Sequence, residues 1–322
     1  MDSNDLYQSL SEIDDEILQR SENVSPKIRS KKSFLKKRFA AIAACVAIIV
    51  GVTLTSEAAN GSVSNFFAPL FGFAQADIVD SIGRPIGVSV SADGYTLTAD
   101  AVIGDQYNVA VVYTLRREDG QPIPDDLYFA DWKTNILAMS GSGGGSLSTI
   151  TDAENPNQIT LIETWSGSRP LFGRYITVSF SNLSIRGEEG EKRVVADGPW
   201  ELHYTLRYQD STQSVPVDHL EVTAEDGRKY QVNKILLSPI GLHIQGLYFD
   251  PVWGEQNTLR DFDVSIQKEN GDIISLVDTT GECSFAKNDT AADIRFEAMF
   301  QQPIPLDEIK SLIICNVEVP IQ

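Results

Sequence analysis

Histidine and cysteine are scarce in this sequence of 322 residues, which contains three of each. No two histidines, and no histidine–cysteine pair, have the spacing of metal ligands. The Gly-x-Ser-x-Gly pattern of serine hydrolases is missing. The glycine-rich stretch 140–148 (SGSGGGSLS) reads as a flexible loop, because no strand precedes it and no helix follows it as in a phosphate-binding loop. We therefore expect no enzyme, no catalytic residue, no metal and no cofactor.

Basic residues are also scarce beyond the N-terminal region. The net charge is −19, but residues 1–38 carry seven acids and eight bases, whereas the remainder carries 38 acids and 18 bases. A region this acidic disfavours nucleic acid and anionic envelope polymers as direct partners, because like charges repel. We expect no direct nucleic-acid partner.

One long uncharged stretch stands out at residues 39–56 (FAAIAACVAIIVGVTLTS), with 18 residues. As a helix it would be roughly 27 Å long, close to the hydrocarbon thickness of about 30 Å. Lys36, Lys37 and Arg38 precede it and Glu57 follows. Positive charge stays on the cytoplasmic side. We expect a single-pass helix in the lipid bilayer of the cell membrane, with a cytoplasmic N-terminus and extracellular C-terminal domains.

Two other interpretations of the apolar stretch remain open. A cleaved signal peptide has a similar pattern, but 38 residues precede this run and a whole signal peptide usually has about 15–30. A buried core helix could be equally apolar, although seven basic residues between Lys27 and Arg38 would be an unusual flank for one.

Residues 1–38 form the predicted cytoplasmic arm, which contains an amphipathic helix. Apolar residues at steps of four, three and four share one helical face. So short an arm cannot bury that face by itself, so the helix either docks on a cytoplasmic protein or lies near the membrane. Its acidic opposite face favours the protein. The predicted partner-binding residues are Leu6, Leu10, Ile13, Asp14, Asp15, Ile17 and Leu18.

Residues 57–75 form a predicted juxtamembrane segment rich in phenylalanine. The crowded apolar residues of 64–80 (SNFFAPLFGFAQADIVD) favour a short helix, either tucked under the following module or dipping into the outer leaflet.

From residue 76 onward, period-two alternation and turn signals such as Asp93-Gly94 predict strands. The expected strands are 86–90, 95–102, 109–115, 159–164, 175–185, 200–207, 220–224, 229–238, 241–249, 262–267, 272–277, 294–299 and 309–319. Residues 209–215 read as a linker. We therefore expect a mainly β fold with two immunoglobulin-like β-sandwich modules, 76–211 and 216–322. The stretches 112–123 and 264–274 echo each other, and both predict strand, turn, strand.

Cys283 and Cys315 both lie in the predicted extracellular part, where a disulfide is chemically possible. Such a bond would close a loop of about 32 residues, worth roughly 3–4 kcal/mol in the chain-entropy model. Two separate buried thiols are the alternative.

Several short motifs, in this order, resemble a family of single-pass membrane proteins of Gram-positive Firmicutes described as anti-sigma-factor-like. They are Leu6-Tyr7, Ile13-Asp14-Asp15-Glu16-Ile17, the basic run with residues 41–51, Asp93-Gly94-Tyr95-Thr96-Leu97-Thr98, Ser181-Asn182-Leu183, Gly198-Pro199-Trp200-Glu201-Leu202, Ser238-Pro239-Ile240-Gly241 and Asp307-Glu308-Ile309-Lys310-Ser311. The resemblance implies a two-part immunoglobulin-like ectodomain of uncharacterised function and an extracytoplasmic-function sigma factor as the cytoplasmic partner. The zinc-binding His-x3-Cys-x2-Cys motif of other anti-sigma families is missing, so any grip on a sigma factor must come from the N-terminal helix.

Two functional hypotheses follow. In the first, the chain is a membrane-anchored regulator whose N-terminal helix binds a cytoplasmic protein while the exported β-domains sense the envelope through an unknown extracellular ligand. In the second, it is a surface-anchored binding or adhesion module without a signalling role.

Overall fold

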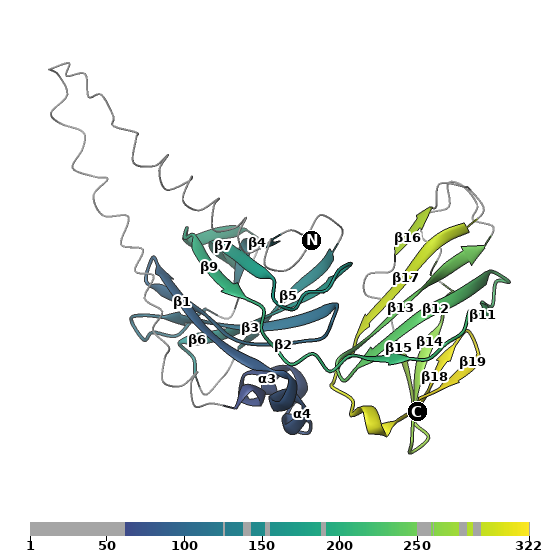
Figure 1. Cartoon of the computed structure of the whole chain (residues 1–322). Coiled ribbons are helices and arrows are strands. Elements are labelled where there is room, and N and C mark those ends of the chain that lie inside the picture. Colours follow the sequence, from purple (N-terminus) through teal and green to yellow (C-terminus); the bar gives the residue numbers. More distant parts are fainter. Residues whose placement is uncertain are drawn as a thin grey trace, which may run out of the picture. The chain divides into compact units, whose positions relative to one another are not determined.

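The computed structural model describes residues 62–124, 126–137, 143–151, 155–187, 191–249, 259, 261–276, 282–285 and 291–321. All of these described residues belong to one compact unit. Its described part is mainly β, with antiparallel strands in four sheets and two α-helices (Figure 1). The mainly β fold class is confirmed, whereas the immunoglobulin-like topology stays a prediction.

Sheets A and B enclose the first hydrophobic core. Sheet A has the order β1-β2-β3-β6-β5, with β1 (Arg84–Ala92), β2 (Tyr95–Gly104), β3 (Asn108–Arg117), β5 (Gly143–Thr151) and β6 (Gln158–Gly167). In sheet B, β7 (Tyr175–Arg186) pairs with β4 (Leu127–Ile136), β8 (Lys192–Ala196) and β9 (Trp200–Thr205). Tyr113 of sheet A packs edge-on against Phe180 of sheet B at 5.4 Å. The indole N–H of Trp200 donates to the carbonyl of Tyr95, so the two sheets are also joined by a buried hydrogen bond.

Sheets C and D enclose a second core. Sheet C contains β10 (Gln213–Val215), β11 (Leu220–Thr223), β12 (Lys229–Ser238), β13 (Gly241–Phe249), β16 (Glu282–Phe285) and β17 (Ala291–Met299). Sheet D contains β14 (Val264–Lys268), β15 (Ile273–Leu276), β18 (Ile309–Ile314) and β19 (Val317–Pro320), and the 3-10 turn η1 (Leu306–Glu308) precedes β18. The Phe262 ring contacts the rings of Tyr230 and Phe296 of sheet C, so aromatic side chains form part of this core.

A third apolar cluster covers the other face of sheet A. Helices α3 (Val63–Phe71) and α4 (Ala76–Ile82) bury Phe67, Phe71 and Ile82 against Ile103 of β2. Strands β2 and β3 are therefore buried on both faces, which explains their nearly continuous apolar sequence. Ile240, in the turn between β12 and β13, belongs to the same cluster.

Asp80 of α4 holds the start of α3. Its carboxylate accepts hydrogen bonds from the Ser64 backbone N–H at 2.8 Å, from the Ser64 hydroxyl at 3.1 Å and from the Ser62 hydroxyl. Burial alone would raise the pKa of Asp80, but these hydrogen bonds outweigh it and lower the pKa. Helix α3 thus lies within the predicted juxtamembrane segment 57–75 and packs on sheet A.

The structure corrects several strand predictions. Residues 143–148, predicted as part of a flexible loop, belong to the edge strand β5. The single strand predicted at 309–319 is a hairpin, because Cys315 and Asn316 adopt positive φ between β18 and β19. The predicted echo fails as well: β14 and β15 form a hairpin, whereas the strand after β3 is β4, which pairs with β7. The predicted linker 209–215 ends in β10, which pairs with β12.

Candidate functional site

The predicted N-terminal site lies outside the described residues. This applies to Leu6, Leu10, Ile13, Asp14, Asp15, Ile17, Leu18, Lys36, Lys37 and Arg38, and to the apolar stretch 39–56. Within the described part of the chain, neither helix has the length and apolarity needed to cross a bilayer. The N-terminal site and the membrane segment stay predictions.

Cys315 is a buried free thiol at the end of β18. Burial raises its pKa to about 11. The side chain of Cys283 lies outside the described residues. The disulfide between Cys283 and Cys315 and the alternative of two separate thiols therefore both stay predictions.

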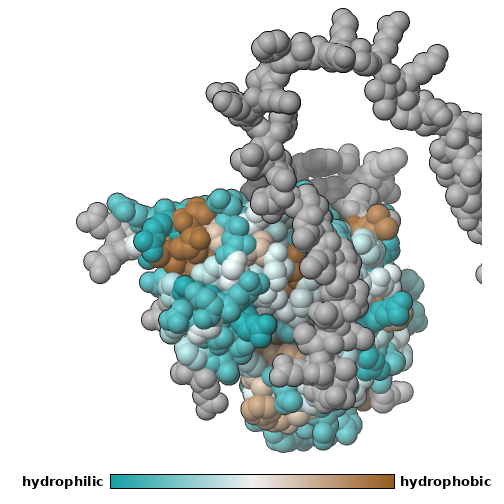
Figure 2. All heavy atoms as spheres, turned by 90° about the vertical axis from the view of Figure 1, so that its left-hand side faces the viewer, coloured by the Kyte–Doolittle hydropathy of each residue, from teal (hydrophilic) through white to brown (hydrophobic). Residues whose placement is uncertain are grey.

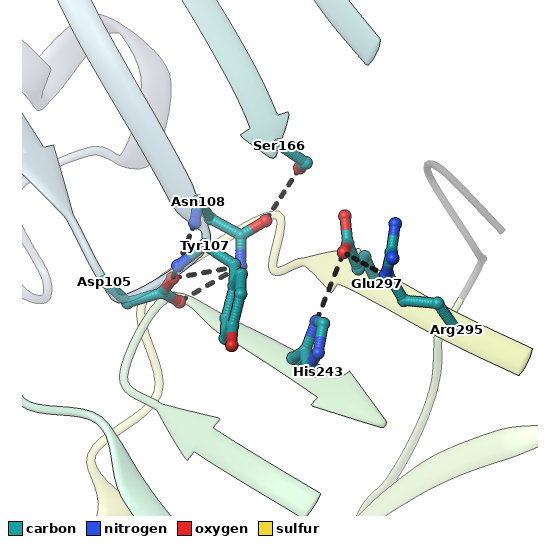
Figure 3. Close-up of polar contacts among 7 residues, drawn as sticks. All are labelled: Asp105, Tyr107, Asn108, Ser166, His243, Arg295 and Glu297. Carbon is teal, nitrogen blue, oxygen red and sulfur yellow. Dashed lines mark hydrogen bonds and ion pairs between the residues drawn. The ribbon is translucent and has the colours of Figure 1, made fainter. Parts of the chain in front are cut away.

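The most polar buried cluster lies where the β2–β3 turn meets the β12–β13 turn (Figure 3). Asp105, at its centre, is buried, and its Oδ1 accepts the backbone N–H groups of Tyr107 at 2.8 Å and Asn108 at 2.7 Å. The Asn108 amide group also donates to Oδ2 at 3.1 Å, and its own oxygen accepts the hydroxyl of Ser166 at 2.7 Å. Burial raises the pKa of Asp105 even though these hydrogen bonds lower it.

Ser238 connects this cluster to sheet C. Its hydroxyl donates to Asp105 Oδ2 at 2.6 Å across 133 residues of sequence, and it also accepts the backbone N–H of Ile240 at 3.2 Å. Gly241 is required by close approach, because a Cβ there would lie 2.6 Å from Asn108 Nδ2 and 2.9 Å from the carbonyl of Ala298. The first β region (sheets A and B) and the second β region (sheets C and D) are thus connected by a buried hydrogen bond.

His243 and Glu297 form a second part of the same junction. Both side chains are only 2% exposed, and His243 Nδ1 lies 3.2 Å from Glu297 Oε1. That distance is within the range of an ion pair when His243 is protonated. The His243 ring stacks on Tyr107 with centroids 4.0 Å apart and planes at 7°. Arg295 Nε lies 3.7 Å from the same Glu297 oxygen, so charges of both signs meet here.

The junction is suited to holding two sheets together. Asp105 accepts hydrogen bonds from both the β2–β3 turn and Ser238 at the end of β12, and Tyr107 covers one face of the His243 ring. No group of three or more metal-ligating side chains occurs among the residues that the structure describes. The clearest physical role of this junction is to hold the β2–β3 turn against the β12–β13 turn.

A different buried carboxylate lies inside the first core. Glu163 accepts hydrogen bonds from Tyr113 at 2.8 Å, from the Trp132 indole at 3.3 Å and from the Thr134 hydroxyl. Tyr113 is also 2.6 Å from the Tyr204 hydroxyl. Burial raises the pKa of Glu163. The adjoining cavity of about 10 Å³ has room for about one water molecule.

Sheet C also carries a shallow hollow of about 360 Å³ on the face away from its core. Lys234, Gln245 and Arg295 are neighbours in register across β12, β13 and β17, and all three line the hollow with Asp293. Its lining of amide and charged groups suits a small polar or anionic ligand.

Sequence reasoning missed these clusters. The period-two pattern predicts both His203 and His243 on the polar side of a strand. His203 is exposed next to Glu201, but His243 is buried. The only local feature that points to the junction is the turn 104–108, in which the Asp105 side chain accepts a backbone N–H. Nothing in the sequence pairs Asp105 with Ser238.

The described chain is thus a mainly β protein with several antiparallel sheets and a buried polar junction. Residues 30–117 match a family model described as Domain of unknown function (DUF4179). The match begins within the basic run and ends at the last residue of β3. No curated protein matches the chain.

Among solved structures, the chain is similar to "The crystal structure of the conserved domain protein from Bacillus anthracis". The sequences are 16% identical over 72% of this chain and 76% of that chain, with a TM-score of 0.49.

Proposed function

We propose that this chain is a membrane-anchored regulatory protein of the anti-sigma-factor-like kind. Residues 39–56 cross the membrane, the N-terminal helix binds an extracytoplasmic-function sigma factor, and two immunoglobulin-like β-sandwiches sense the envelope outside. The proposed protein is not an enzyme, because its role lies in binding and transmitting a change of state.

The observation that carries this proposal is the docking of α3 on sheet A. Helix α3 begins seven residues after the apolar stretch ends, and its Phe67 and Phe71 are buried in a cluster that also contains Ile240 of the β12–β13 turn. A displacement of either β region would therefore act on the segment next to the membrane. The Asp105–Ser238 hydrogen bond adds a second connection between the regions.

The family match is consistent with such coupling. It covers the later part of the basic run, the apolar stretch, α3, α4 and β1 to β3, so the proposed anchor and part of the first β region fall within one matched segment. A signal still requires that the N-terminal helix bind its partner differently in two states.

The test uses the full-length chain in detergent, co-expressed with each extracytoplasmic-function sigma factor of its host in turn. Leu10→Asp with Ile13→Asp removes two apolar contacts worth about 1.5–3 kcal/mol each, so we expect binding of the partner to weaken by roughly 100-fold or more. Glu12→Gln, on the opposite face, is the matched control and should bind as wild type. Failure of the wild-type chain to capture any of these sigma factors would contradict the proposal.

The hollow on sheet C favours a second candidate, a surface-anchored binding or adhesion module. Lys234→Ala with Gln245→Ala should then abolish attachment of cells to their target, while Lys133→Ala on sheet B should not. Deleting residues 2–25 would leave attachment unchanged under this hypothesis but would abolish regulation under the first.

A further inference from the structure

The turn between α3 and α4 presents an exposed aromatic side chain. Gly72 ends α3 with φ of 68°, and Gly72, Phe73 and Ala74 are all exposed. At 69%, Phe73 is the most exposed large hydrophobic side chain in the described part of the chain. Such exposure is unfavourable in water, so a surface that covers Phe73 would be stabilising.

Phe73 is held outward by the packing of its neighbours. Phe67 and Phe71 fill the space between α3 and sheet A, and Asp80 of α4 binds the first turn of α3. Both ends of the turn are therefore fixed to the β region.

The sequence segment that contains Phe73 lacks charged residues. Residues 58–76 contain no charged side chain, although residues 39–322 together carry 38 acids and 18 bases. Hydrophobic residues reach the surface at the lower end of the face in Figure 2, at the height of α3 and α4 in Figure 1. Half-buried Phe66 and Leu70 and exposed Pro69 belong to this uncharged segment.

The length of chain before α3 limits where this turn can lie. Val63 follows Ser56 by seven positions, and each step along an extended chain spans at most about 3.6 Å. The start of α3 therefore lies within roughly 25 Å of the end of the apolar stretch. Phe and Leu are among the apolar side chains with which interfacial segments enter the boundary between headgroups and acyl chains.

We propose that the α3–α4 turn is a lipid-contacting site, in which Phe73, flanked by Pro69 and Leu70, inserts into the interfacial region of the outer leaflet. The inference rests on the proposed membrane anchoring. The partner is the lipid surface itself, and the absence of charge in residues 58–76 removes the need for an anionic headgroup. The site would set the orientation of sheet A relative to the bilayer.

The test reconstitutes the full-length chain in phosphatidylcholine vesicles with and without brominated acyl chains. Phe73→Trp adds a fluorophore to the four natural tryptophans, and its contribution is the difference from wild type. We expect brominated lipid to quench most of this added fluorescence. Ile273→Trp is the matched control, because Ile273 is 61% exposed on β15, and its added fluorescence should persist.

Two failures are distinguishable. If the wild-type chain does not float with vesicles, the membrane anchoring in the proposed function is wrong. If the chain floats but the fluorescence added by Phe73→Trp is quenched no more than that added by Ile273→Trp, the lipid-contacting site is wrong and the anchoring stands. Phe73 is exposed, so neither outcome depends on the variant repacking a core.

Discussion

Two buried carboxylates in this chain, Asp105 and Asp100, differ in the number of groups that donate hydrogen bonds to them. Asp105 receives two backbone N–H groups, the Asn108 amide and the Ser238 hydroxyl. Asp100 of β2 is similarly buried, but its side-chain donor is the Thr114 hydroxyl at 2.7 Å. Burial raises the pKa of Asp100 to about 7. A buried group with few donors favours its neutral form, which makes stability depend on pH.

Asp100→Asn should stabilise the protein above neutral pH. The folded pKa of about 7 lies above the unfolded value near 3.9, so the folded form binds its proton more tightly and wild type loses stability as pH rises between them. The full loss is of the order of 4 kcal/mol at most. Thermal unfolding of the full-length chain at pH 5 and pH 8 should show a larger gain for the variant at pH 8. Asp218→Asn, at an exposed position, should show no such difference.

Ser238→Ala tests the junction. The change leaves buried Asp105 without one donor, which we expect to reduce the free energy of unfolding by about 1–3 kcal/mol. Exposed Ser214→Ala is the control and should change stability by less than about 0.5 kcal/mol. Equal melting temperatures for the two variants would mean that the Asp105–Ser238 hydrogen bond does not hold the regions together.

Cys315 should resist thiol reagents while the protein is folded. With a pKa of about 11, about one thiol in a thousand is ionised at pH 8, and the side chain is also buried. In a chain carrying Cys45→Ser and Cys283→Ser, labelling at pH 8 should need denaturant. In a chain carrying only Cys45→Ser, a mass lower by two hydrogens under oxidising conditions would instead show that Cys283 and Cys315 are bonded.

At the scale of elements, α3 depends on tertiary contacts. It has nine residues, too few for a stable isolated helix, and Pro69 lies within it. The N-cap residue Ser62 makes no capping bond of its own, and Asp80 supplies the acceptor from α4 instead. The helix therefore forms because Phe67 and Phe71 pack on sheet A.

Asp80→Ala should weaken this helix pair. The loss of the capping acceptor should cost about 1 kcal/mol, measurable as faster hydrogen exchange in residues 63–71. Because the folded pKa of Asp80 is lowered, the wild-type contribution is present above the unfolded pKa near 3.9 and disappears as pH falls through the folded value. Asp77→Ala, at an exposed position in α4, should leave exchange in α3 nearly unchanged.

Strand prediction succeeded where alternation was clean and failed where it was not. Leu202 and Tyr204 of β9 face the core and Glu201 and His203 face outward, as the period-two pattern predicted. Strand β5 begins with three glycines and has no apolar alternation to reveal it. It forms because β6 offers an edge of backbone hydrogen-bonding groups, and that pairing depends on residues in the partner strand.

At the scale of the whole molecule, topology is the property on which the proposed function depends. Protease added to intact cells should remove a C-terminal epitope and leave an N-terminal tag on a fragment of residues 1 to about 57. The apolar stretch would shield the N-terminal arm, because charge and length place it across the bilayer. Permeabilised cells should lose both epitopes. Survival of both epitopes in intact cells would contradict the predicted orientation.

The sequence alone was enough to predict a mainly β fold, a short helix within 64–80 and a marked charge asymmetry, because alternation, turn chemistry and charge are local properties. Tertiary packing decided which polar side chains became buried. Asp105 in its turn, and His243 and Glu297 in their strands, look like surface residues, and they are buried because two sheets distant in sequence meet over them. Such burial depends on neighbours from other strands, and no single stretch of sequence contains that information.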